Sequence, residues 1–207
     1  YTVTDTKGCT SIASITVSEP TVLNASASSG TISCQGGTTT ITVNATGGTS
    51  PYSGTGIFIV TAGTYNYTVT DAKGCTSNAS ITVNEPAVLN ASAGSGVISC
   101  HGGTTTINVS ATGGTAPYNG TGSFTVTAGN YNYTVTDAKG CTSIASISVI
   151  EPADLNALAS SGVISCHGGT TNIIVSATGG TTPYSSTGSF SVTAGTYNYS
   201  VTDAKGC

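Results

Sequence analysis

The chain of 207 residues repeats itself every 66 residues, and this period limits what it can fold into more than any other feature. One set of cysteines follows a recurring Asp-x-Lys-Gly turn, and a second set precedes a recurring x-Gly-Gly segment. The first set is Cys9, Cys75, Cys141 and Cys207, and the second is Cys34, Cys100 and Cys166. A period this strict predicts one small fold built several times in tandem.

The module boundaries are predicted at a Glu-Pro dipeptide that recurs with the same period. Residues 1–19 are then the C-terminal strands of a preceding repeat. Residues 20–85 form a first module, 86–151 a second, and 152–207 a third that stops before its last strand. Because Tyr1 lies inside a predicted strand, we expect the sequence to be a window from a longer protein.

Charged residues make up only 6% of the chain, against about a quarter in ordinary globular domains. The net charge of −4 is spread along the modules without a basic patch, which argues against nucleic acid and anionic membranes as partners. Hydrophobic residues make up 37% and alternate with polar ones, which argues against disorder. No apolar run approaches the roughly 18 residues of a membrane span.

Period-two alternation predicts the strands and their inward faces. In the first module it places Ile41 and Val43 toward a core. Phe58 and Val60 are also predicted to point inward, because the second module keeps Phe and Val there and replaces the intervening residues with polar ones. After a break at Ser28-Ser29-Gly30, Thr31–Cys34 is expected to resume the first strand.

Five to seven short strands in each module, with no helical periodicity, predict an all-β fold made of small two-sheet sandwiches. Aromatic residues are expected to complete each core. They are Phe58, Tyr65 and Tyr67 in the first module, Phe124, Tyr131 and Tyr133 in the second, and Phe190, Tyr197 and Tyr199 in the third. A core this small is marginal by itself, so a cross-link is physically reasonable.

Regularly spaced cysteines in small modules predict structural disulfides formed in an oxidising compartment. The favoured pairs lie within modules and are Cys34–Cys75, Cys100–Cys141 and Cys166–Cys207, and Cys9 is then expected to pair with a cysteine upstream of this window. Each closes a loop of about 40 residues and stabilises the module by roughly 3–4 kcal/mol on the chain-entropy model. The alternative pairs cross a boundary and are Cys9–Cys34, Cys75–Cys100 and Cys141–Cys166. If the two cysteines of a module lie at opposite ends of the sandwich, the bond must join neighbouring modules.

The remaining polar residues give weak site signals. His101 and His167 follow cysteines, but the first module has Gln35 there, so surface-turn residues are the better interpretation. Asp71 and Asp137 are weak calcium candidates, and a turn-capping role is preferred for them. No Ser-His-Asp set or paired-acid site repeats, so we predict no catalytic residues, no metal, no cofactor and no enzymatic activity.

Three stretches of the repeat together carry a family resemblance: SCQGGTTTITVNATGG, GTYNYTVTDAKGCTS and ASITVNEP. They resemble the SprB-type repeat of secreted Bacteroidetes surface proteins, which include the large gliding-motility adhesin. The resemblance covers essentially the whole chain and implies tandem Ig-like β-sandwiches, export by the type IX system and an extracellular, cell-surface location. The chain departs from many relatives around Pro51-Tyr52, where they carry a longer aromatic strand with Trp.

The segment Gly63–Tyr67 also resembles the tyrosine corner of Ig-like domains, with Tyr65 at the corner. Plain packing of aromatic side chains is the other interpretation. Tyr131 and Tyr197 occupy the same position in the later modules.

The period, the bland surface and the expected cross-links favour a structural role. The first hypothesis is a non-catalytic repeat region, a rod or filament, in a secreted bacterial adhesin. The second is a repeated glycan- or protein-binding module that uses an exposed loop carrying Tyr52, Tyr118 or Tyr184. A third is sideways association of identical modules into an extracellular fibre. Neighbouring repeats, copies of the chain and surface glycans are the partners that these hypotheses name.

Overall fold

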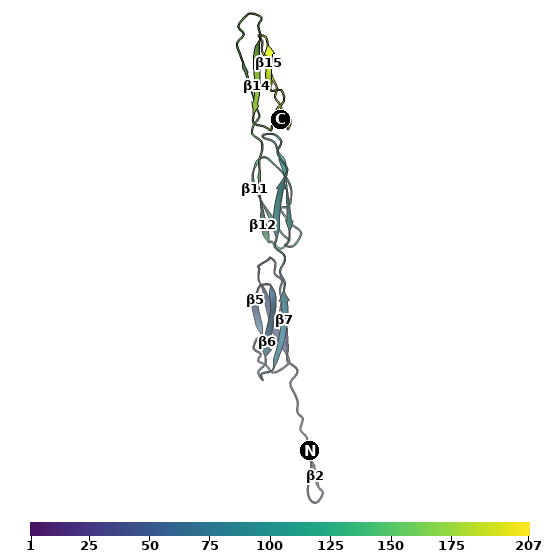
Figure 1. The fold of residues 1–207 in the computed structure, drawn as a ribbon. Coiled ribbons are helices and arrows are strands. Elements are labelled where there is room, and N and C mark those ends of the chain that lie inside the picture. The colour runs from purple at the N-terminus through teal and green to yellow at the C-terminus, as the bar shows by residue number, and fades with distance from the viewer. The chain divides into compact units, whose positions relative to one another are not determined.

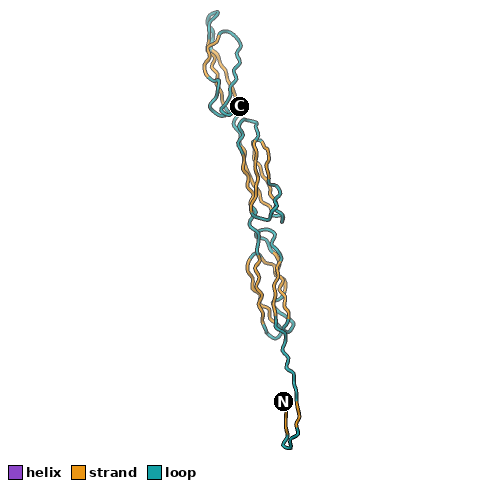
Figure 2. The backbone as a smooth tube through the Cα atoms, turned by 90° about the vertical axis from the view of Figure 1, so that its right-hand side faces the viewer, coloured by secondary structure: helices purple, strands orange, loops and turns teal.

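Threonine, valine, isoleucine and tyrosine favour strands, and the computed structural model describes all of residues 1–207 as strands, turns and loops without a helix (Figure 2). The prediction of an all-β fold is therefore confirmed. No helix is present that is long and apolar enough to cross a membrane. The chain separates into two compact units, Tyr1–Pro86 and Ala87–Cys207, which are described in turn.

Unit 1 contains a short N-terminal hairpin and the first module (Figure 1). The hairpin pairs β1 (Thr2–Thr4) with β2 (Thr10–Ile12). The module has β3 (Asn24–Ser29), β4 (Thr39–Thr46), β5 (Gly56–Val60), β6 (Gly63–Thr70) and β7 (Thr76–Val83). One antiparallel sheet has the order β3-β4-β5, and a second pairs β6 with β7. Strand β7 also lies beside β3, where the Ala25 N–H donates to Ser77 Oγ at 3.1 Å.

Unit 2 contains the second and third modules (Figure 1). The second has β8 (Asn90–Ser95), β9 (Thr105–Thr112), β10 (Gly122–Val126), β11 (Gly129–Thr136) and β12 (Thr142–Val149). Its sheets, β10-β9-β8 and β11-β12, have the same order as those of the first module. The third module has one sheet of three strands, β13 (Asn156–Ser161), β14 (Thr171–Thr178) and β15 (Gly188–Val192).

The core of the first module lies between its two sheets. Ile41 and Val69, from different sheets, are both 0% exposed and belong to one hydrophobic cluster. Phe58 lies directly opposite Ile41 in the β4–β5 pairing and packs against the same cluster. Ile57 and Ile59 are 71% and 77% exposed. The inward and outward positions predicted by alternation and by comparison of modules are therefore confirmed.

The aromatic residues extend this core. The rings of Phe58 and Tyr67 lie 4.7 Å apart between centroids, and the Tyr65 hydroxyl donates to the carbonyl of Thr61 at 3.1 Å. That bond to a carbonyl four residues upstream is the contact expected of a tyrosine corner. In the second module Tyr131 bonds Thr127 in the same way.

Two local predictions are wrong. Strand β3 continues through Ser28 and Ser29, and Thr31–Cys34 is not a strand. The chain leaves the sheet after Gly30, whose N–H still donates to the carbonyl of Thr40. Ile32 is 6% exposed because it joins the core cluster from a loop. The Thr-Ile-Ser segment is therefore part of a loop whose isoleucine side chain packs into the core.

Tyr197 is the second exception, because it is 41% exposed instead of buried in a core. Its counterpart Tyr131 lies in β11, which pairs along eight residues with β12. Residues 152–207 contain no counterpart of β12, and residues 195–200 form no strand. Tyr197 is therefore less covered than Tyr131, which is half-buried, although Phe190 and Tyr199 keep their ring contact at 4.8 Å.

Candidate functional site

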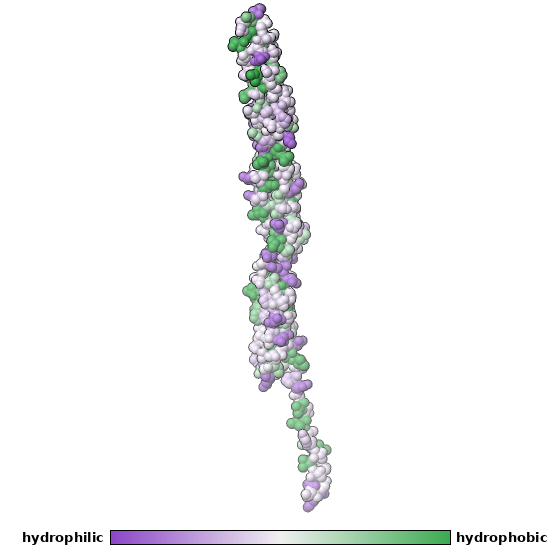
Figure 3. Space-filling view, in the orientation of Figure 1, coloured by the Kyte–Doolittle hydropathy of each residue, from purple (hydrophilic) through white to green (hydrophobic).

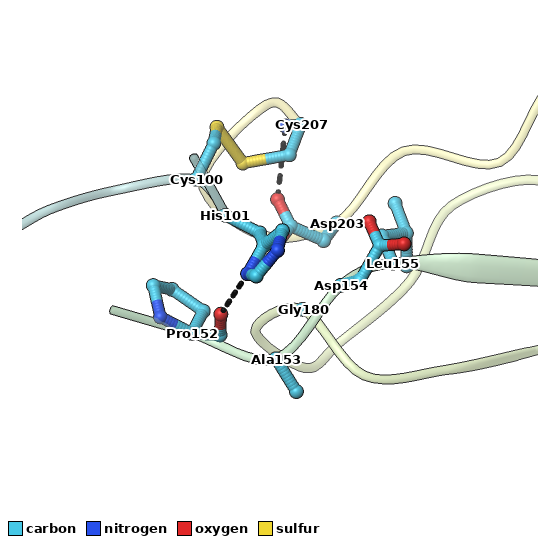
Figure 4. A pocket seen from close by; sticks show the side chains of 9 residues that line it. All are labelled: Cys100, His101, Pro152, Ala153, Asp154, Leu155, Gly180, Asp203 and Cys207. Carbon is cyan, nitrogen blue, oxygen red and sulfur yellow. Dashed lines mark hydrogen bonds between the residues drawn. A yellow bond between two sulfur atoms is a disulfide. The ribbon is translucent and has the colours of Figure 1, made fainter. Parts of the chain in front are cut away.

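Three segments of unit 2 meet at the joint between the second and third modules (Figure 4). They are the turn at Cys100-His101, the connecting segment Pro152–Leu155, and the hairpin turn that ends at Cys207. Together with Gly180 they line a small pocket of about 240 Å³. We call this arrangement the joint site.

A disulfide between Cys100 and Cys207 closes the joint site. The two Cα atoms are 5.7 Å apart, and the bond spans 107 residues of sequence. It therefore links a turn of the second module to a turn of the third. Cys34 and Cys141 are disulfide-bonded as well, and Cys9, Cys75 and Cys166 are exposed free thiols.

The predicted disulfide pairs are therefore wrong. Cys100–Cys141 and Cys166–Cys207 are excluded by the bond between Cys100 and Cys207, and Cys34–Cys75 is excluded because Cys75 is free. The boundary-crossing alternatives, Cys9–Cys34, Cys75–Cys100 and Cys141–Cys166, each contain a free cysteine as well.

Strand geometry explains why the cysteines of one module do not pair. Cys141 immediately precedes β12, and the start of β12 lies beside the start of β8, where the Ala91 N–H donates to Ser143 Oγ at 3.1 Å. Cys100 follows the opposite end of β8. A six-residue strand is roughly 20 Å long, whereas a disulfide requires Cα atoms within about 7 Å. The bond therefore has to leave the module.

Glu151 holds the Cys100-containing turn from the other side. Its Oε2 accepts the Gly102 N–H at 2.6 Å, while Oε1 lies 3.5 Å from His101 Nδ1. His101 Nδ1 is also 3.2 Å from the carbonyl oxygen of Pro152, and the His101 side chain is 50% exposed. In unit 1 Glu85 accepts the Gly36 N–H at the same distance, 2.6 Å, although Gln35 replaces the histidine.

The Glu-Pro dipeptide predicts only a module boundary from the sequence, whereas the structure shows that its glutamate also clamps the cysteine-containing turn. A usable signal was present, since a glutamate before proline and a Cys-x-Gly-Gly turn recur in register. The histidine, by contrast, occupies the exposed turn position that was predicted for it.

A buried aspartate shapes the turn that presents Cys207. Asp203 is 6% exposed; its Oδ1 accepts the N–H groups of Lys205 and Cys207, and Oδ2 accepts that of Thr181. The distances are 2.8, 3.0 and 2.7 Å. Asp71 and Asp137 make the corresponding bonds in the other modules.

These contacts establish the turn-capping geometry and give no support to calcium binding by Asp71 and Asp137. Their oxygens face backbone N–H groups, whose positive ends attract an anion and oppose a cation. No group of three or more His, Cys, Asp or Glu side chains is placed to hold a metal.

The same hydrogen bonds lower the pKa of these carboxyl groups below 3.8, the ordinary value for aspartate. The bond from the Cys207 N–H is the largest cause at Asp203, and that from the Thr49 N–H is the largest at Asp71. At Asp137 burial is the largest influence and raises the pKa, but the N–H donors led by Thr115 together outweigh it.

Stability is therefore expected to depend on these aspartates in acid. Because the folded-state pKa is lower than the unfolded one, their contribution is complete above about pH 4 and disappears as the pH falls through the folded-state pKa. Asp137→Asn is expected to lower the urea midpoint at pH 7 and to flatten the loss of stability below about pH 4. Asp154→Asn, at an exposed position, is the matched control. An unchanged acid profile in Asp137→Asn would contradict this assignment.

The tyrosines proposed for ligand contact are engaged within their own modules. The hydroxyl groups of Tyr52 and Tyr118 each donate to a glycine carbonyl, Gly47 and Gly113, at 2.6 Å. Both rings are half-buried and pack against the hydrophobic clusters. Tyr184 donates to Gly179 in the third module. Each hydroxyl thus holds the glycine-containing loop that precedes it, and only part of each ring is exposed to a possible sugar ligand.

The joint site therefore offers a covalent link, a carboxylate clamp and a capped turn. The carboxylates of Glu151 and Asp203 both accept backbone N–H groups within the fold, and Cys100 is bonded to Cys207. No protein-family model matches the chain, and none of the curated proteins matches it either.

Proposed function

We propose that this chain is a structural repeat region of a secreted bacterial surface adhesin or extracellular filament. In this proposal, Ig-like β-sandwich modules with a 66-residue period follow one another in a rod, and disulfides fasten them together. The resemblance to SprB-type repeats extends the proposal to a Bacteroidetes cell surface and to gliding motility.

The observation that carries the proposal is the bond between Cys100 and Cys207, because it connects one module to the next. Disulfides persist mainly in oxidising, extracellular environments, which supports secretion. The surface also supports a passive role, since it is largely of intermediate hydropathy (Figure 3). Such a surface has few charges with which to attract a nucleic acid or an anionic membrane.

Electron microscopy tests the rod. Negative-stain images of the oxidised chain are expected to show elongated particles with an axial repeat of roughly 30–40 Å, one module length at ~3.3 Å per strand residue plus loops. Compact globular particles would contradict the proposal.

The compartment needs a separate measurement. Protein taken directly from its source cells, with thiols blocked at lysis, is expected to yield a peptide in which Cys100 is bonded to Cys207. Recovery of both residues as alkylated thiols would rule out an extracellular location.

The glycan- or protein-binding alternative receives less support, because the hydroxyl groups of Tyr52, Tyr118 and Tyr184 are occupied within the module. It is tested by glycan-array binding of the second and third modules, which should be lost in Tyr118→Ala if the alternative is correct.

A further inference from the structure

Strand β5 is the edge strand of its sheet in the first module, because the order of that sheet is β3-β4-β5. Figure 1 shows it along the margin of the module. Its outward side chains, Ile57 and Ile59, are 71% and 77% exposed. The second module has Ser123 and Thr125 at these positions, on its own edge strand β10. The apolar edge therefore belongs to the first module and is not a general property of the repeat.

The backbone groups of the same two isoleucines also face the open edge. In the β3–β4 pairing the Gly30 N–H donates to the carbonyl of Thr40, so the backbone groups of Thr40 point toward β3. Thr40 lies opposite Ile59 in the β4–β5 pairing. Because opposite residues of an antiparallel pair point their backbone groups the same way, toward or away from each other, those of Ile59 point away from β4. Those of Ile57, two residues earlier, share this direction, and no hydrogen bond outside the strand pairings engages either residue.

This edge lacks the features that usually keep exposed strand edges apart, namely charged side chains, proline and bulges. Residues 39–60 contain no Asp, Glu, Lys or Arg, and β5 contains no proline. Its pairing with β4 runs without a bulge over all five residues. A charged ligand would find no opposite charge here, whereas a second uncharged edge would meet no repulsion.

The edge is also complementary to itself. Antiparallel pairing of two β5 strands about a two-fold axis at Phe58 sets Ile57 of one copy opposite Ile59 of the other. Each such pair can exchange two hydrogen bonds, because both residues direct their backbone groups to the edge, and the symmetry supplies two such pairs. The same register places the isoleucine side chains of each pair next to each other on the outer face of the sheet.

We propose that two copies of this chain associate through the edges of their β5 strands. The sheet β3-β4-β5 of one copy then continues into β5-β4-β3 of the other. Two edges of five residues bury less than the roughly 1,200 Å² of a standard interface, so the dimer is weak, with a dissociation constant of about 0.01–1 mM. The association does not depend on the role proposed above, because it concerns the isolated chain.

Sedimentation velocity of the full chain tests the dimer. The free thiols of Cys9, Cys75 and Cys166 are first alkylated, so that disulfide-linked dimers cannot form. A reversible equilibrium between monomer and dimer is expected between about 10 µM and 1 mM. A chain that stays monomeric throughout this range would overturn the proposal. Association that continues past the dimer would also overturn it, because a two-fold contact is used up by one partner.

A charge at the edge should prevent the pairing. Ile57→Lys is expected to weaken the dimer by about tenfold or more, because it removes the apolar contact and puts a positive charge on each side of the two-fold axis. Ile144→Lys is the matched control, since Ile144 is 63% exposed on β12, which lies between β11 and β8 and has no open edge. Equal weakening by the two substitutions would contradict the assignment to β5. Urea midpoints of both variants show whether the fold is intact.

A proline tests the backbone pairing without adding charge. Ile59→Pro removes an N–H that points to the edge, a position where strands tolerate proline. Each copy loses one hydrogen-bond donor to its partner, and we expect the dimer to weaken by about tenfold or more. Thr125→Pro makes the same change at the same position of the second module and should leave the dimer unchanged. If the two proline variants dimerise alike, the β5 backbone has no part in the contact.

Amide hydrogen exchange locates the contact independently of any substitution. The amides of Ile57 and Ile59 are expected to exchange about twofold or more slowly at 1 mM than at 10 µM, because the dimer engages them in hydrogen bonds. The amides of Ser123 and Thr125, on the corresponding edge of the second module, should exchange at the same rate at both concentrations. Unchanged exchange at Ile57 and Ile59, or equal protection of both edges, would place the dimer contact elsewhere and overturn the proposal.

Discussion

Replacing Ile107 by alanine is expected to lower the free energy of unfolding of the second module by about 2–5 kcal/mol. Ile107 is 0% exposed, lies opposite Phe124 in the β9–β10 pairing, and belongs to the cluster that contains Val135 from the other sheet. Removing its side chain leaves a cavity that two short sheets cannot close without losing other contacts. Urea denaturation followed by circular dichroism, with hydrogen exchange to locate the effect, measures the change.

Ile144→Ala is the matched control within the same module. Ile144 is 63% exposed on β12, so its truncation should change the unfolding free energy by less than about 0.5 kcal/mol. Similar effects of the two substitutions would contradict the assignment of the core.

The second large effect is expected from Cys100→Ser, which opens the link to Cys207. The bond closes a loop of 107 residues, and the chain-entropy model assigns a loop of that length about 4–5 kcal/mol. We expect the loss to concentrate in the third module, whose single sheet has no paired strand covering residues 195–202. Hydrogen exchange of residues 195–207 should accelerate more than that of β9 or β11.

Cys166→Ser controls for the substitution itself, because Cys166 is an exposed free thiol in the same module. It should leave both the thermal midpoint and the exchange pattern unchanged. If Cys100→Ser behaved in the same way, the joint site would have no part in stabilising the third module.

Features that depend on neighbouring residues could be predicted from the sequence. The inward faces of Ile41 and Val43 follow from period-two alternation, which reflects the pleat of a single strand. The inward direction of Phe58 and Val60 follows only from comparison of the modules, because the four consecutive apolar residues 57–60 do not reveal which face is buried. Gly74 and Asp71 likewise mark a hairpin whose geometry is decided within five residues.

Features that depend on how the strands are arranged could not be predicted in this way. The pairing of Cys100 depends on which end of β8 lies near the start of β12, and connectivity of this kind cannot be deduced from spacing alone. The clamp between Gly102 and Glu151 joins residues 49 apart in the chain. Ile32 looked like a strand residue because burial of a single loop side chain gives the same local pattern.

The position of the disulfide at the joint site decides how unit 2 would carry a pulling force. Tension applied to Ala87 and Cys207 would travel through residues 87–100 and then cross the sulfur–sulfur bond, so that residues 101–206 would bear no load. With the bond reduced, the same segment could lengthen by roughly 350 Å at ~3.3–3.6 Å per residue. In the oxidised chain, tension between these two points therefore could not unfold the third module. The maximum extension between Ala87 and Cys207 would be limited by the disulfide, whatever the stability of the sheets.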